Sequence, residues 1–72
     1  MNKNITKFSR FNQGYLCAVA ALINMDGQVE TRTKELFIAG VGKYDLRKMR
    51  QWGIDEQDIE VFKKHRKELI TK

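Results

Sequence analysis

The sequence contains no proline, one cysteine and one histidine among its 72 residues. Because Cys17 is the only cysteine, no disulfide can form within the chain. With His65 as the only histidine, a tetrahedral zinc site would need mostly carboxylate ligands, which is an unusual donor set. We therefore expect no metal and no cofactor. A domain this small, without such cross-links, depends on close helix packing or on a second subunit, so a homodimer is possible.

The chain also lacks a long apolar run. The segment YLCAVAALI, at residues 15–23, is shorter than the roughly 20 apolar residues that cross a bilayer. Lysines precede it, as in a signal peptide, but removal of such a leader would leave too little chain to fold. An unpaired cysteine fits a reducing compartment. We expect a protein of the cytoplasm with no membrane partner.

Apolar side chains in the first third of the chain recur at spacings of three and four, which predicts one face of an amphipathic helix. The residues of this predicted inner face are Phe8, Phe11, Tyr15, Ala18 or Val19, Leu22 and Met25. Thr6 or Ser9 could cap the helix, and Asp26-Gly27 ends it. Gly14 lies inside it, and a close approach of another helix would explain a glycine there.

A strand is the alternative for residues 15–23, because Asp26-Gly27 is also a hairpin signal. Three alanines in this segment favour the helix, since alanine is depleted in strands. In the helix, Cys17 lies within the most apolar stretch of the chain, and we predict that it is a small buried residue.

Three more helices are predicted after Gly27. The second is capped by Thr31 or Thr33, extends to about Ala39 and has Leu36, Phe37 and Ile38 as its apolar residues. The third covers about 44–51, with Leu46 and Met49 pointing inward. Gly53 follows at a position that favours a left-handed conformation, with Ile54 able to contact Met49.

Asp55 is a strong N-cap for the fourth helix, which is predicted from Glu56 to about Ile70. Its inner face is marked by Ile59, Phe62, His65 or Arg66, and Leu69. Acidic residues begin this helix and basic residues end it, as the helix dipole prefers. The sequence therefore predicts an all-α fold: a compact bundle of four short helices in a single domain, 1–72, with residues 1–6 as a flexible N-terminus.

No residue pattern indicates catalysis. Nothing near Cys17 in the sequence would lower its pKa, and His65 could pair with Cys17 only if the tertiary fold brought the two together. The acidic residues at the start of the fourth helix fan around its axis instead of converging as a catalytic pair must; they are Asp55, Glu56, Asp58 and Glu60. The sequence GVGK, at 40–43, lacks the rest of a phosphate-binding loop. We therefore expect that the protein is not an enzyme.

The basic residues make DNA or RNA a possible partner. The chain has 14 Lys and Arg against 9 Asp and Glu, a net charge of +5 that attracts polyanions. Residues 31–52 have the outline of a helix-turn-helix, whose second helix would present Lys43, Arg47, Arg50 and Gln51, helped by Lys63, Lys64 and Lys67. The second helix is short and begins with Asp45, and a solvated basic face explains the same residues.

Protein binding is the other possibility. Tyr44, Arg47, Arg50 and Trp52 form the mixture of Tyr, Arg and Trp that is typical of interface hot spots. A role for Trp52 in the core is an equally good interpretation, since a small domain needs its large side chains inside.

Two segments carry a resemblance to known proteins: Tyr15-x-Cys17-Ala18-Val19-Ala20, and Gly53-Ile54-Asp55-Glu56-x-Asp58. With TKELFIAGVG between them, they resemble short proteins encoded by bacteriophages and prophages. The resemblance implies an accessory protein that inhibits or modulates a host protein complex, defence machinery included. It assigns no catalytic or ligand-binding residue.

Overall fold

The computed structural model of the chain describes the backbone of residues 7–70 and the side chains of residues 10–70. This part contains no strand and five α-helices: α1 (Lys7–Asp26), α2 (Thr31–Val41), α3 (Leu46–Gln51), α4 (Glu56–Lys64) and α5 (Arg66–Ile70). The predicted all-α class is confirmed, and residues 15–23 are helical. The predicted flexible segment 1–6 lies outside the described residues.

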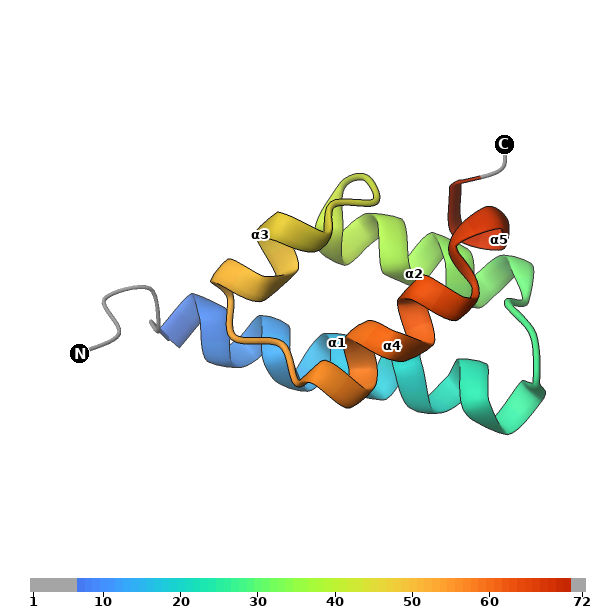
Figure 1. Cartoon of the computed structure of the whole chain (residues 1–72), viewed down its shortest axis with the longest axis horizontal. Coiled ribbons are helices and arrows are strands. Elements are labelled where there is room, and N and C mark those ends of the chain that lie inside the picture. Colours follow the sequence, from blue (N-terminus) through green and yellow to red (C-terminus); the bar gives the residue numbers. More distant parts are fainter. Residues whose placement is uncertain (1–6, 71–72) are drawn as a thin grey trace.

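The long helix α1 carries the rest of the molecule on one side (Figure 1). After a turn at Gly27, which has a φ of 72°, α2 returns alongside α1 in the opposite direction. Helix α4 also packs on α1, while α5 contacts α2 and α4. The short α3 and α5 lie at opposite ends of the upper edge in Figure 1.

The segment that was predicted as the fourth helix forms two helices, α4 and α5. The described part of the chain therefore has five helices and not the predicted four. His65 leaves the helical conformation with φ of −106° and ψ of 23°, and α5 starts at the next residue. The amide of His65 still donates to the Val61 carbonyl at 3.1 Å, and the amide of Leu69 donates to the His65 carbonyl at 3.1 Å. The change of direction lets Leu69 be buried while α5 contacts α2.

The ends of α3 are the best-specified local structures. The Asp45 carboxylate accepts from the Lys48 amide at 3.0 Å, which places Asp45 at the N-cap and not inside the helix. Gly53 has a φ of 81°; its amide donates to the Arg50 carbonyl at 3.0 Å, and the Ile54 amide donates to the Met49 carbonyl at 3.2 Å. These two bonds are the Schellman ending that was predicted.

The predictions for the other caps were partly correct. The Asp55 carboxylate accepts from the Gln57 amide at 2.8 Å, which confirms it as the N-cap of α4. Glu30, and not Thr31 or Thr33, occupies the N-cap of α2, and its side chain makes no capping hydrogen bond.

The core takes one or more side chains from each helix. It consists of Leu16, Val19, Ala20, Ile23, Phe37, Val41, Met49, Ile54, Ile59, Phe62 and Leu69. The rings of Phe37 and Phe62 meet at its centre, with centroids 5.1 Å apart. Ile59, Phe62 and Leu69 confirm the predicted inner face of the C-terminal segment.

The predicted inner face of α1 is mostly wrong. Of its residues only Val19 is buried, and Asn12, Leu16, Ala20 and Ile23, which were not predicted, are buried with it. Of the predicted stripe, Phe11 is 67% exposed, Met25 is 80% exposed, and Ala18 and Leu22 are exposed as well, while Tyr15 is half-buried and the Phe8 side chain lies outside the described residues. The reason is that α1 carries apolar residues on two faces, and the other helices cover only one of them.

Because the other apolar face of α1 points inward, the prediction that Cys17 is buried is also wrong, and its side chain is exposed. Of the three apolar residues noted for the second helix, Phe37 is buried, and Leu36 and Ile38 are exposed. A Cβ on Gly40 would lie 2.4 Å from the Tyr15 ring, whose hydroxyl donates to the Leu36 carbonyl at 2.6 Å. Gly40 therefore lets α1 and α2 approach closely.

Candidate binding surface

The two arginines predicted as contact residues lie on the outside of α3. Because Met49 is buried beneath this helix, Arg47, Arg50 and Gln51 are exposed. The Arg50 guanidinium forms an ion pair with the Glu56 carboxylate at 3.3 Å, with both side chains in solvent. Exposed pairs of this kind contribute only about 0–1 kcal/mol, so Arg50 can exchange Glu56 for a partner's carboxylate at little cost.

Tyr44 was predicted as a contact residue of the surface, but its side chain is half-buried. Its ring centroid lies 6.1 Å from that of Phe37, and its hydroxyl donates to the Phe62 carbonyl at 3.4 Å. The Arg66 guanidinium lies 5.7 Å from the ring centroid. Burial raises the pKa of Tyr44, although Arg66 and Arg50 oppose the shift. The phenol therefore stays neutral at physiological pH.

Trp52 is half-buried and packs against the core, so the core interpretation describes it better than a free hot spot does. Its carbonyl accepts from the Gln13 side-chain amide at 2.7 Å, which ties the end of α3 to α1. The Lys48 ammonium lies 5.4 Å from the ring centroid. The two aromatic residues of the predicted surface are thus half-buried, and its two arginines are accessible.

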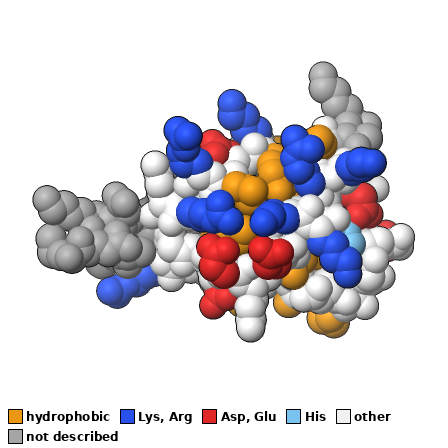
Figure 2. All heavy atoms as spheres, in the orientation of Figure 1, with side chains coloured by type: hydrophobic (Ala, Val, Ile, Leu, Met, Phe, Trp, Pro, Cys, Tyr) orange, Lys and Arg blue, Asp and Glu red, His pale blue; other side chains and the backbone are white. Residues whose placement is uncertain are grey.

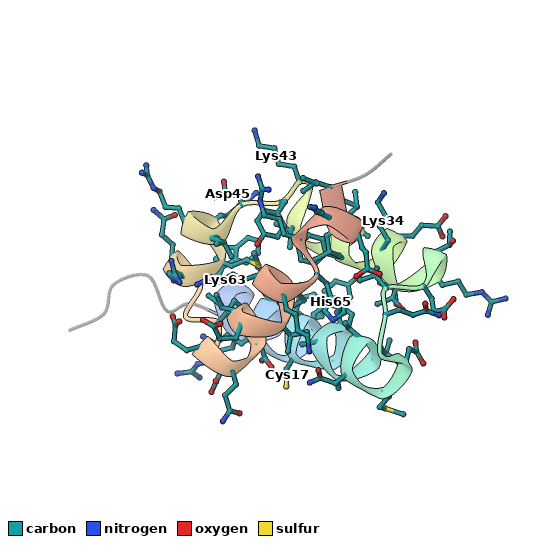
Figure 3. All side chains as sticks on the ribbon, turned by 45° about the vertical axis from the view of Figure 1, so that its right-hand side comes forward. Cys17, Lys34, Lys43, Asp45, Lys63 and His65 are labelled. Atoms are coloured by element: carbon teal, nitrogen blue, oxygen red, sulfur yellow. The ribbon has the colours of Figure 1, made fainter. Side chains whose placement is uncertain are left out.

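An open groove of about 350 Å³ lies between α2, the turn at 42–45 and α5. Its lining residues are Lys34, Ile38, Gly42, Lys43, Tyr44, Leu69 and Ile70. The two lysines come from different elements, yet they lie on the same edge of the molecule in Figure 3. The groove therefore combines an apolar floor with a cationic rim, a combination that the sequence analysis did not find because its residues are far apart in the chain.

The basic side chains are not spread evenly. On the face shown in Figure 2, Lys and Arg side chains lie over α3, α4 and α5 around exposed apolar atoms, with a cluster of acidic side chains below them and a few acidic side chains among them. Of the predicted nucleic-acid residues, Lys43, Lys64 and Lys67 are exposed, and Lys63 forms an exposed ion pair with Glu60 at 3.4 Å.

The geometry of α3 limits how far residues 31–52 can act as a helix-turn-helix. Helix α3 has six residues, a length of roughly 9 Å at 1.5 Å per residue, and the carboxylate of Asp45 stands at its N-terminus. Lys43 and Tyr44 lie in the turn before the helix and not on it. Only Arg47, Arg50 and Gln51 of the predicted recognition residues are therefore presented by α3.

Cys17 and Asp58 form a contact between α1 and α4 that the sequence analysis did not predict. The thiol hydrogen-bonds to the Asp58 carboxylate, and the negative charge of Asp58 is the main reason that the pKa of Cys17 is raised. Burial raises the pKa of Asp58, and the hydrogen bond with Cys17 opposes that shift. A raised thiol pKa disfavours the thiolate that a nucleophilic cysteine needs.

Glu68 joins three segments and was also missed. Its carboxylate contacts His65 Nδ1 at 2.5 Å and accepts from the Val29 amide at 3.1 Å. The hydrogen bond with His65 and then that with Val29 lower the pKa of Glu68. This contact fastens α5 to the turn before α2. The i,i+3 spacing of His65 and Glu68 is a sequence signal for the first contact, but nothing in the sequence indicates the contact with Val29.

Residues 10–70 contain no group of three His, Cys, Asp or Glu side chains that could hold a metal ion. Within the described chain, no helix is both long and apolar enough to cross a membrane. The fold and its surface define a small all-helical protein with a cationic, apolar groove. A scan against protein-family models and searches of curated proteins and of solved structures found no significant match.

Proposed function

We propose that this protein acts without catalysis, by binding another protein through the groove between α2, the turn at 42–45 and α5. The observation that carries the proposal is that the apolar residues Ile38, Tyr44 and Leu69 and the basic residues Lys34 and Lys43 line the same groove. An apolar anchor can fill such a groove while acidic residues beside it pair with the rim. The expected partner is therefore a protein segment with apolar and acidic side chains.

The chemistry of the other polar groups supports a non-catalytic role. The thiol of Cys17 has a raised pKa because of Asp58, and His65 is engaged by Glu68. The carboxylates at the start of α4 serve as caps and ion pairs, as with Asp55 on the Gln57 amide and Glu56 on Arg50.

The resemblance to phage-encoded accessory proteins gives the proposal a biological context. It makes a host protein complex, defence machinery included, the expected class of partner, and inhibition or modulation of that complex the expected effect. The cytoplasm is the expected place of action, because a reducing compartment keeps the exposed thiol of Cys17 from oxidising.

The proposal is tested by comparing variants in a pull-down from bacterial lysate. Ile38→Asp and Lys43→Glu each replace an exposed residue that lines the groove, so neither alters the buried core. Each substitution should abolish retention of the partner. Arg32→Glu is the matched control, because this exposed residue is also on α2 but does not line the groove. Retention that is the same for wild type and both groove variants would exclude the groove as the contact site.

Nucleic-acid binding is the second candidate, favoured by the basic face over α3, α4 and α5 (Figure 2). If it is correct, retention on a DNA column should fall steeply with added salt, because phosphate contacts release counterions. Arg47→Ala combined with Arg50→Ala should remove most of this retention. A wild-type protein that is not retained even at low salt would exclude this function.

A further inference from the structure

The outer face of α2 carries a second hollow beside the groove, with a volume of about 480 Å³. Its lining residues are Thr31, Lys34, Glu35, Ile38 and Ala39. All of them belong to α2, and Lys34 and Ile38 also line the groove. The two hollows are therefore neighbours, and together they extend along α2 from its first residue to its C-cap, Gly42.

The spacing of the lining residues indicates which kind of segment fits this hollow. Four of them, Thr31, Lys34, Glu35 and Ile38, stand at positions i, i+3, i+4 and i+7 of one helix. In helix–helix packing, four residues of one helix form the hole that receives a side chain of the facing helix. Residues 7–70 contain no strand to whose edge an extended segment could add. The outer face of α2 is therefore shaped to accept a helix.

The charged residues beside the hole indicate the chemistry of that helix. Lys34 and Glu35 are consecutive, so their side chains lie about 100° apart around α2, on opposite sides of Ile38. Within residues 10–70, Lys34, Glu35 and Lys43 form no ion pair, whereas Arg50 and Lys63 each pair with a glutamate. Lys34 and Lys43 both point outward on the same edge of the molecule (Figure 3). These three charges are thus open to a partner.

Resting on the proposed function, we infer that the partner presents an amphipathic α-helix, which lies along α2 and fills both hollows. One apolar side chain of that helix inserts into the hole at Thr31, Lys34, Glu35 and Ile38. Another enters the groove over Tyr44 and Leu69. Acidic residues on one flank of the partner helix face Lys34, and basic residues on its other flank face Glu35. Opposite charges beside an apolar seam select the partner, as they do in coiled coils.

The length of α2 sets the length of the partner helix. Its 11 residues span roughly 16 Å, so about three turns of the partner cover the face. Ala39 and Gly42 lie at the C-terminal end of this face, and both are small and exposed. The backbone of the partner helix can therefore come close to α2 at this end, where its side chains reach Lys43.

The first experiment uses a synthetic peptide of about 15 residues, held helical by a side-chain cross-link. It carries a stripe of leucines, with glutamates on one flank and lysines on the other. Ala39→Arg fills the second hollow and should raise the dissociation constant, measured by fluorescence anisotropy, roughly tenfold or more. Gln57→Arg is the matched control, because this exposed residue of α4 lines neither hollow, and it should leave binding unchanged. Circular dichroism confirms that each variant is folded.

The second experiment exchanges charges, with a second peptide that carries lysines on both flanks. Wild type should bind the first peptide more tightly than the second, by roughly 2- to 5-fold for each pair at the rim. Lys34→Glu should reverse this preference, because the second peptide then meets a carboxylate on both sides. Wild type that binds neither peptide, or a preference that Lys34→Glu leaves unchanged, would overturn the inference.

The pull-down from lysate separates this inference from the proposed function. Release of the partner by Ile38→Asp, Lys43→Glu and Ala39→Arg supports a helix along the whole of α2. If the two groove variants release the partner but Ala39→Arg retains it, the inference is wrong and the proposed function stands. If all three retain it, the proposed function itself fails. Self-association of wild type that Ala39→Arg abolishes, measured by sedimentation, would show that a second copy occupies this face and would also overturn the inference.

Discussion

At the scale of single residues, two glycines in helices have opposite environments. Gly40 lies under the Tyr15 ring, so that a Cβ would approach the ring carbons to 2.4 and 2.8 Å. Gly14 has open space around it within the chain. The sequence gives no sign of this difference, because both glycines follow residues typical of helices.

Gly40→Ala should therefore destabilise the protein by roughly 1–3 kcal/mol, since the Tyr15 ring must move and release the Leu36 carbonyl. Gly14→Ala should instead stabilise the monomer by about 0.5–1 kcal/mol. Urea unfolding at low protein concentration measures both changes. Equal effects from the two substitutions would contradict this account of the α1–α2 contact.

Cys17 allows a second prediction at this scale. Because the charge of Asp58 is the main cause of the raised thiol pKa, Asp58→Asn should lower that pKa and speed labelling by a thiol reagent at mildly alkaline pH. Glu60→Gln removes another carboxylate of α4 and is the control. The pH dependence of the labelling rate is the measurement, and an unchanged profile in Asp58→Asn would rule out the assigned cause.

At the scale of elements, helix ends were more predictable than helix faces. The Schellman ending at Gly53 and the cap at Asp55 follow from local chemistry, and both are present. The inward face of α1 could not be deduced, because without a charged residue between Phe11 and Met25 neither apolar face is marked as the outer one. The inward face of α1 is the one on which α2 and α4 pack, and the positions of these two helices depend on the whole chain.

The break at His65 was missed for a related reason. No proline or glycine marks it, and the charge pattern of 56–70 suits one continuous helix. The α5 segment is held by the contact of Glu68 with Val29, a residue far away in the sequence. The groove was likewise not predictable, because Lys34, Lys43 and Leu69 meet only after this turn forms.

Gly53→Ala tests how much the end of α3 depends on its left-handed glycine. A Cβ at a φ of 81° should cost about 1–2 kcal/mol of stability. Gln51→Ala, at an exposed position of the same helix, should change stability little. Thermal or urea unfolding measures both. A Gly53→Ala variant as stable as wild type would show that the Schellman ending contributes little.

At the scale of the whole molecule, acid should loosen the attachment of α5. The folded pKa of Glu68 is lowered by His65 and Val29, so its contribution to stability is present above the pKa of an unfolded glutamate, about 4.3. This contribution is lost as the pH falls through the lower folded value. Glu68→Gln should therefore show a weaker loss of stability in acid than wild type does.

Glu35→Gln is the control for this prediction, because Glu35 is an exposed carboxylate of α2. The measurement is the free energy of unfolding as a function of pH for the three proteins. A curve for Glu68→Gln that is parallel to that of wild type would contradict the assignment. Since Leu69 and Ile70 line the groove, partner binding should weaken over the same acidic range.

The mixed lining of the groove gives salts two opposite effects on the proposed partner binding. Any salt screens the attraction between Lys34 or Lys43 and an acidic partner. A sulfate salt also strengthens the contact of an apolar side chain with Ile38, Tyr44 and Leu69. At equal ionic strength, ammonium sulfate should therefore weaken partner binding less than sodium chloride does, so that a comparison of the two salts separates the charged from the apolar part of the contact without any substitution.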